Sequence, residues 1–143
     1  MTSLYNNDEQ TENANSMTEL FGEVISSYSR AQAIEDGVLV DVSETAREAG
    51  FRFPVAVTRR LFDEVITPDP RSEKNGQSVA GRLWDTLNML RFAIRGSRGG
   101  QVILYKVIFI MKANQRRTLT LKSACGPGDN LEPTITIMMP DED

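Results

Sequence analysis

The 143-residue sequence contains no histidine and a single cysteine, Cys125. Histidine is the usual general base near neutral pH and the commonest metal ligand. Its absence excludes Ser-His-Asp and Cys-His catalysis, and it excludes zinc sites built from cysteine and histidine. A chain with one cysteine forms no internal disulfide, which is typical of a reducing cytoplasm. We therefore expect a cytoplasmic protein that is not an enzyme and binds no metal or cofactor.

Long hydrophobic runs are also missing. No run approaches the length of about 18 apolar residues that a membrane span needs. The N-terminus has no basic segment followed by an apolar one, so no secretory signal is expected. Within a net charge of -4, residues 1–28 carry five acids and no base. We expect residues 1–18 to form a disordered acidic leader and residues 19–143 to form one domain.

The hydrophobic pattern of this domain predicts an α+β fold. The strongest helix is expected at 78–95, where apolar residues repeat at helical spacing and form one buried stripe that includes Trp84 and Ile94. Shorter helices are expected at 28–36, 44–49 and 54–66, and strands at 38–42, 102–111, 118–124 and 134–139. The strand at 102–111 is almost entirely apolar, so we place it in the middle of the sheet. The prediction is a three- to four-stranded antiparallel sheet, ending in a C-terminal meander, with about four helices packed on it.

The segment 45–60 resembles the helix-turn-helix of bacterial repressors. A helix of small residues would end at Gly50, and a second helix would begin at Pro54. Arg59 and Arg60 would then lie late in the second helix, where they would contact DNA phosphates. Pro54 and Val55 stand where a recognition helix offers polar groups to base edges. The competing interpretation is a plain helical hairpin packed on the sheet.

Other candidate binding groups are a glycine-rich loop and two basic clusters. The loop CGPGD at 125–129 has backbone amides suited to an anion, and Asp129 suits an acid or weak metal ligand, although a tight hairpin needs the same residues. If the end of the long helix and the basic turn at 112–117 lie at opposite ends of the central strand, about 33 Å separates their basic residues and the two clusters cannot form one patch. Solvated surface charge is the competing explanation for both clusters. The partner-binding candidates are Arg59, Arg60, Arg91, Arg95, Arg98 and Asp129.

Three long strings in the chain resemble a known family. They are LFGEVISSYSRAQAIEDGVLVDVSETAREAGFRFPVAVTR (20–59), AGRLWDTLNMLRFAIR (80–95) and LKSACGPGDNLEPTITIMMPDED (121–143). They are similar to small uncharacterised proteins, a family of unknown function, carried on bacterial plasmids and integrative mobile elements. The resemblance supplies no catalytic residues. It implies a context of antirestriction and other accessory genes of mobile DNA.

These observations lead to one expected function and two alternatives. We expect a non-enzymatic binding protein of mobile elements, an antirestriction or anti-defence inhibitor of a host protein complex. Its acidic leader and tail suit the nucleic-acid channel of a host protein. The first alternative is a DNA-binding regulator that uses residues 45–60, and the second is a carboxylate- or metal-dependent enzyme centred on Asp129. The expected partner is a host protein, with DNA as the alternative and no membrane. Homodimerisation through the sheet stays open.

Overall fold

The computed structural model describes residues 28–74, 76–110 and 115–143. The expected acidic leader and Lys112 lie outside these residues. The chain divides into two compact units, residues 1–33 and residues 34–143. Of the first unit, residues 28–33 are described, and they include the start of helix α2 (Arg30–Glu35). No helix in the described parts of the chain is long and apolar enough to cross a membrane.

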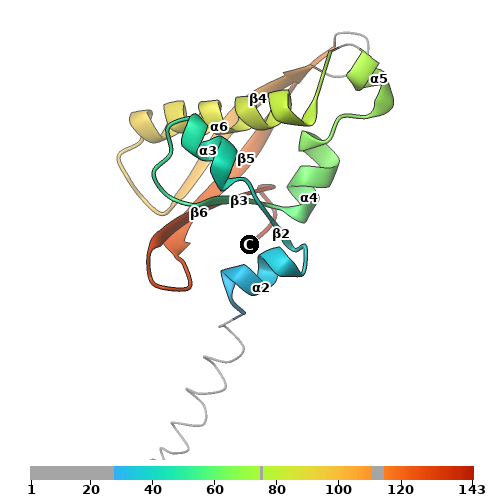
Figure 1. Ribbon diagram of the computed structural model, residues 1–143. Helices are drawn as coiled ribbons and strands as arrows, with labels where there is room; N and C mark the ends of the chain where they lie inside the picture. The colour runs from blue at the N-terminus through green and yellow to red at the C-terminus, as the bar shows by residue number, and fades with distance from the viewer. Residues whose placement is uncertain (1–27, 75, 111–114) are drawn as a thin grey trace, which may run out of the picture. The chain divides into compact units, whose positions relative to one another are not determined.

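The second unit contains a five-stranded sheet in the order β2-β3-β6-β5-β4 (Figure 1). Neighbouring strands are antiparallel except for β3 and β6, which are parallel. The predicted α+β class and the C-terminal meander of β4, β5 and β6 are confirmed. The predicted sheet of three to four antiparallel strands is wrong, because an unexpected parallel strand lies within it. The strands are β2 (Leu39–Asp41), β3 (Val55–Thr58), β4 (Val102–Ile110), β5 (Arg116–Pro127) and β6 (Pro133–Met138).

Strand β3 occupies the segment that was expected to begin a helix at Pro54. Its residues are mostly β-branched, and the first three are buried, so tertiary packing favours a central strand over a helix. The carbonyl of Pro54 accepts a hydrogen bond from the Ile135 amide, which joins this segment to β6. Helical structure begins only at Arg59. The helix-turn-helix geometry predicted for 45–60 is therefore wrong, since its second element is a buried strand.

Five α-helices lie in the described residues, and the predicted long helix is among them. Helix α6 begins after Ser78, whose hydroxyl accepts a hydrogen bond from the Gly81 amide at 3.0 Å. A short π-helix, Phe62–Ile66, continues α4. Helix α5 lies between the predicted helices 54–66 and 78–95, in a segment for which no helix was predicted. Besides α2, the helices are α3 (Ser43–Glu48), α4 (Arg59–Leu61), α5 (Pro70–Lys74) and α6 (Val79–Gly96).

The hydrophobic core lies between α6 and one face of the sheet. Leu83, Leu87 and Leu90 on α6 are buried there together with strand residues such as Val57 and Leu121. Burial of each leucine contributes about 1.5–3 kcal/mol before conformational entropy is counted. Buried side chains of α3, α4 and the π-helix complete the same core.

Two predictions about burial are wrong. Trp84 is 41% exposed and Ile94 is 39% exposed, because α6 turns only the part of its stripe that contains the leucines toward the sheet. Strand β4 lies at an edge of the sheet and not in its middle. Its residues alternate between a buried face and an exposed face, so the apolar run covers one face of the sheet and leaves the other open.

Candidate functional site

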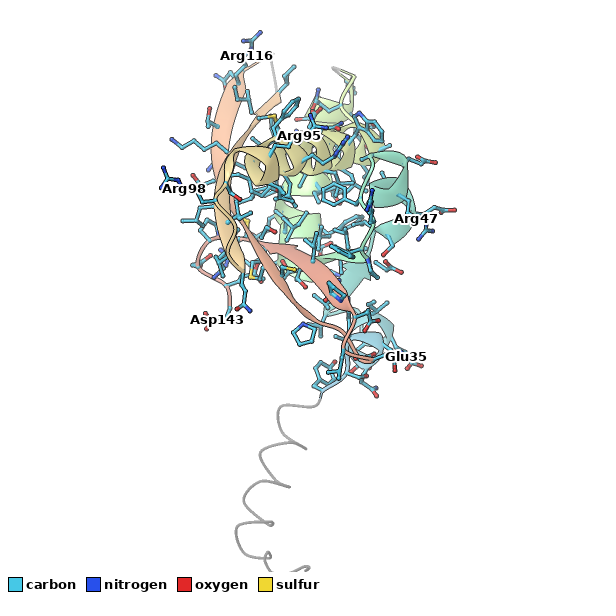
Figure 2. The ribbon with its side chains drawn as sticks, turned by 90° about the vertical axis from the view of Figure 1, so that its left-hand side faces the viewer. Glu35, Arg47, Arg95, Arg98, Arg116 and Asp143 are labelled. Carbon is cyan, nitrogen blue, oxygen red and sulfur yellow. The ribbon has the colours of Figure 1, made fainter. Side chains whose placement is uncertain are left out.

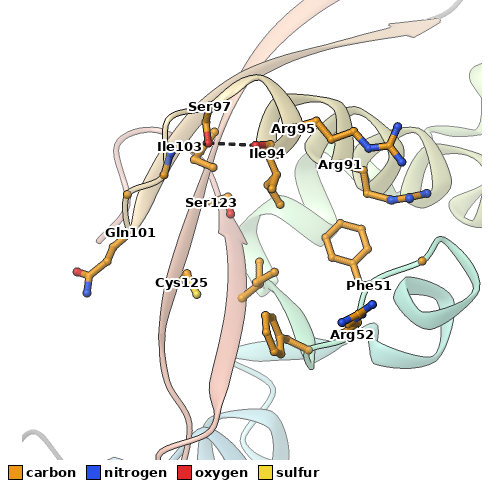
Figure 3. A pocket seen from close by; sticks show the side chains of 15 residues that line it. Phe51, Arg52, Arg91, Ile94, Arg95, Ser97, Gln101, Ile103, Ser123 and Cys125 are labelled. Carbon is orange, nitrogen blue, oxygen red and sulfur yellow. Dashed lines mark hydrogen bonds between the residues drawn. The ribbon is translucent and has the colours of Figure 1, made fainter.

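A pocket of about 610 Å³ opens between the C-terminal half of α6, the loop at 50–53 and the first residues of β4 (Figure 3). The loop follows α3 directly and leads into β3, so the sheet and α3 fix both of its ends. The far wall comes from β5 and β6, through residues such as Ser123 and Ile135. All of its described walls belong to the second unit, residues 34–143.

Three arginines line this pocket, and we call it the arginine pocket. Arg91 and Arg95 are one helical turn apart on α6, and Arg52 comes from the loop opposite (Figure 3). No acidic residue is among the described residues that line it. Within the described chain, no ion pair joins these three guanidinium groups to an acidic side chain. The pocket therefore presents positive charge that the described residues do not neutralise.

Arg91 is held in place by the end of helix α3. One of its guanidinium nitrogens donates a hydrogen bond to the carbonyl of Ala49 at 2.6 Å. The backbone of Gly50 lies directly beneath this group, and a Cβ built at Gly50 would be 2.9 Å from Arg91 Cζ. Gly50 also has a φ of 102°, a conformation that side chains other than glycine rarely adopt. Gly50 thus places the loop and Arg91 together at the wall of the pocket.

The floor of the pocket is apolar. Phe51, Ile94, Ile103 and Ile135 line it, together with the half-buried thiol of Cys125. A pocket of this composition combines a surface that binds apolar groups with guanidinium groups that bind carboxylates or phosphates. The arrangement can hold a ligand that is both apolar and negatively charged.

The structure places the six predicted binding residues in different locations. Arg91 and Arg95 line the arginine pocket, while Arg98 is exposed in the turn that follows α6 (Figure 2). Arg116 lies at the opposite end of the β4–β5 pair, because the register joins Ile110 to Arg116. The expected separation of the two basic clusters is confirmed for the described residues.

Arg59 and Arg60 lie elsewhere, and the chain's own acids surround them. Arg60 contacts Asp141 at 2.8 Å and Glu64 at 3.4 Å, and Arg59 contacts Asp63 at 3.5 Å. The hydrogen bond from Arg60 holds the pKa of Asp141 below its usual value, and the same bond raises the pKa of Arg60. We call these five residues the tail cluster. Of these five, Arg59 and Arg60 also border a second hollow of about 450 Å³ near the C-terminus.

The acidic tail is engaged with the rest of the domain. Glu142 accepts hydrogen bonds from the Thr58 hydroxyl and from the Met139 amide, both at 2.8 Å. Lys122 donates a hydrogen bond to the backbone carbonyl of Glu142. Two of the acids that were expected to occupy a partner's nucleic-acid channel, Asp141 and Glu142, thus stabilise the position of their own tail.

Asp129 lies in an exposed turn and is not among the residues that line the arginine pocket. The predicted loop 125–129 is shifted, since β5 continues to Pro127 and the turn occupies 128–132. The Glu132 carboxylate accepts a hydrogen bond from the Asn130 amide at 2.9 Å. Within the expected anion site, the Gly128 amide is already bonded, since it donates a hydrogen bond to the backbone carbonyl of Glu132 at 2.6 Å. No group of three or more cysteine, aspartate or glutamate residues suited to a metal occurs in the described chain.

Sequence reasoning missed Arg52 and the phenylalanines beside it. Arg52 stands between Phe51 and Phe53 in an irregular segment, for which the sequence predicted the turn of a helical hairpin. An arginine between two aromatic residues after a glycine was the available signal. This signal does not show that Arg52 lines a pocket, because the other two arginines of that pocket come from α6, further along the chain.

Comparison with known proteins gives a family without an assigned activity. Residues 17–143 match the model of a family of unknown function, DUF6573, and the chain belongs to this family. No curated protein and no solved structure gave a significant match.

Proposed function

We propose that this protein is a non-enzymatic binding protein whose arginine pocket holds an acidic, partly apolar segment of a partner protein. The observation that carries the proposal is the set of three arginines, without an acidic neighbour in the described lining, around an apolar floor. In the tail cluster, by contrast, acids of the same chain form ion pairs with both arginines.

The chemistry of the pocket favours a carboxylate next to an apolar side chain. A guanidinium group forms paired, charge-assisted hydrogen bonds with a carboxylate, and these are stronger than bonds between neutral groups. Phe51 and Ile94 offer an apolar surface on which an aromatic or aliphatic side chain can pack. Anchors of this kind supply most of the binding energy in protein interfaces. The volume of about 610 Å³ lies within the usual range for ligand pockets.

The ionisable groups of the pocket support a role without catalysis. Among its described lining residues, arginine and Cys125 are the ionisable types. Arginine does not lose its proton in proteins and so cannot act as a general base. The thiol of Cys125 has no histidine anywhere in the chain to activate it.

The resemblance to proteins of mobile elements suggests which partner to look for. In such a context the partner would be a component of a host defence system, and the protein would act as its inhibitor. Arg59 and Arg60 support DNA binding less well, because Asp63, Glu64 and Asp141 neutralise them.

The test is capture of the partner by wild-type protein and by a pocket variant. Tagged full-length protein is incubated with bacterial host lysate, with and without nuclease, and bound proteins are identified by mass spectrometry. The pocket variant is Arg52→Glu with Arg95→Glu, which leaves the bond between Arg91 and Ala49 in place. The control is Arg116→Glu with Arg117→Glu, which makes the same charge change on exposed residues at the far end of β5.

We expect a stoichiometric partner that survives nuclease, binds wild type and control equally, and is lost from the pocket variant. Two charge-assisted bonds contribute about 1.5 kcal/mol or more each, so the pocket variant should bind at least about 100-fold more weakly. A partner that binds all three proteins equally would contradict the pocket as the site. A partner list that vanishes with nuclease would favour DNA.

Cys125 offers an independent readout, because it is the sole cysteine and lines the pocket. Occupation of the pocket should slow alkylation of Cys125 by iodoacetamide, measured by mass spectrometry of the intact protein. The inhibitor role is tested by expressing the protein in a restricting host and measuring entry of unmodified plasmid DNA. Wild type should raise entry, and the pocket variant should not.

A further inference from the structure

The outer edge of β4 is an unpaired strand with an apolar face. Val102, Leu104 and Ile108 are 57–62% exposed on the sheet face that α6 does not cover, and Lys106 is the charged residue among them. In the described chain, no strand pairs with the side of β4 that faces away from β5. Long, apolar edge strands are templates for pairing with another chain, and proteins usually protect them with charges, bulges or proline.

The register shows which backbone groups point outward. The amide of Cys125 donates a hydrogen bond to the carbonyl of Gln101 at 2.7 Å, so residues 101 and 125 form a hydrogen-bonded pair. Such pairs recur at every second residue of an antiparallel ladder. The odd-numbered residues of β4 therefore bond to β5, and the N–H and C=O groups of the even-numbered residues point to the open edge. The side chains of these same residues make up the exposed apolar face.

Helix α6 lies along β4 on the other face of the sheet and adds apolar side chains beside this edge (Figure 1). Arg82 donates a hydrogen bond to the carbonyl of Ile110 at 2.9 Å, so this side of α6 lies beside the outer edge of β4. Met89 is two helical turns from Arg82, on the same side and about 10 Å further along. Met89 is 40% exposed and Phe92, one turn on, is 64% exposed. The backbone edge thus has apolar side chains on both faces of the sheet.

We infer that β4 pairs antiparallel with β4 of a second copy of this chain, giving one continuous sheet across a two-fold axis near Lys106. A two-fold axis at Lys106 pairs residue 104 with 108 and residue 102 with 110, so apolar side chains meet apolar side chains along the strand. Nine residues make a strip about 30 Å long. Side chains on both faces of the sheet widen this strip to about 20 Å, because each packed layer adds about 10 Å. About 600 Å² per copy falls at the lower end of stable interfaces.

Lys106 makes the affinity of this dimer depend on the salt concentration. The axis brings the Lys106 side chains of the two copies close together, and like charges opposite each other on paired strands repel. Higher salt should therefore tighten the dimer, whereas it weakens interfaces held by opposite charges. Lys106→Thr should tighten it at low salt, an effect that misfolding cannot produce.

The test is sedimentation velocity of the full-length protein from about 1 to 100 μM, at low and high salt. We expect a species of twice the mass of one chain. Ile108→Pro removes an outward N–H that β5 does not use, a position that tolerates proline at an edge, and should raise the dissociation constant at least tenfold. Leu104→Lys should do the same. Leu131→Lys, at an 83% exposed site in the turn before β6, is the control and should leave the constant unchanged.

Circular dichroism confirms that each variant is folded. A wild-type protein that stays monomeric at 100 μM at both salt concentrations would overturn the inference. A dimer that Ile108→Pro and Leu104→Lys leave intact would overturn it as well, because another surface would then form the contact. Neither result bears on the arginine pocket, which is tested by its own variants.

Discussion

The arginine pocket and the tail cluster use the same side chain in opposite surroundings. Arg52, Arg91 and Arg95 surround an apolar floor, with no acid among the described lining residues. Arg59 and Arg60 face acids that the same chain supplies, two of them one helical turn further along. Electrostatic attraction to a partner depends on charge that is not already neutralised. The number of arginines in a segment therefore does not identify a binding surface. What identifies it is whether acids of the same chain already pair with those arginines.

Arg82 differs from the arginines of both groups, because its role is structural. It is 3% exposed and donates hydrogen bonds to the carbonyls of Val65 and Ile110. Burial lowers its pKa, an effect that Asp69 partly opposes. Arg82→Met should lower the free energy of unfolding by about 3 kcal/mol, since the buried carbonyl of Val65 and the partly buried carbonyl of Ile110 lose their donor. Urea unfolding measures this.

The matched control for Arg82→Met is Arg95→Met in the same helix. Because Arg95 is exposed and serves binding in our account, its replacement should change stability by less than about 0.5 kcal/mol. Equal destabilisation by the two variants would show that Arg95 is a structural residue, and the distinction between the two kinds of arginine would fail.

Gly50 links the fold to the pocket and gives the next largest effect. Gly50→Ala forces a side chain into a φ of 102° and brings its Cβ against Arg91. We expect a loss of about 1–2 kcal/mol in stability and weaker binding of the partner, because Arg91 must move. Thermal unfolding and partner capture measure the two effects. Gly96→Ala is the control, since no atom lies within 4 Å of the added Cβ, and it should impair neither.

The tail cluster predicts a smaller effect that depends on pH. Arg60 holds the pKa of Asp141 below its ordinary value, so the stabilisation is present above about pH 4 and is lost as the pH falls through the depressed pKa. Asp141→Asn should therefore be slightly less stable than wild type at pH 6, and this difference should vanish near pH 2. Urea unfolding at both pH values measures it, with Glu48→Gln as an exposed control. A difference that is the same at both pH values would contradict the ion pair as its source.

Local patterns in the sequence predicted much of the fold. Helical spacing predicted α6, and Ser78 marked its start correctly. Alternation predicted a strand at 134–139, where β6 lies, and the alternating residues Ile135 and Ile137 are buried. These elements could be predicted because neighbouring residues decide their conformation. Strand β3 could not, because its parallel partner β6 lies about 80 residues away and so short an apolar run also fits a helix.

The sequence identified two of the three arginines of the candidate site. Arg91 and Arg95 stood out at the end of a helix, and the structure places both in the pocket. Arg59 and Arg60 stood out equally, but their neutralisation by Asp141 depends on the position of the C-terminal tail. The edge position of β4 was missed for a related reason. An apolar run predicts burial on both faces, and it does not tell whether the second face is covered by the same chain.

The most direct test of the account is nuclear magnetic resonance of the arginine side chains. The Nε–Hε signals are followed while a capped peptide of alternating aspartate and phenylalanine is added to the full-length protein. Our account predicts saturable shifts for Arg52, Arg91 and Arg95, and unchanged signals for Arg59 and Arg60. Shifts at Arg59 and Arg60 with unchanged pocket signals would contradict it, because binding would then occur where the chain neutralises its own charge.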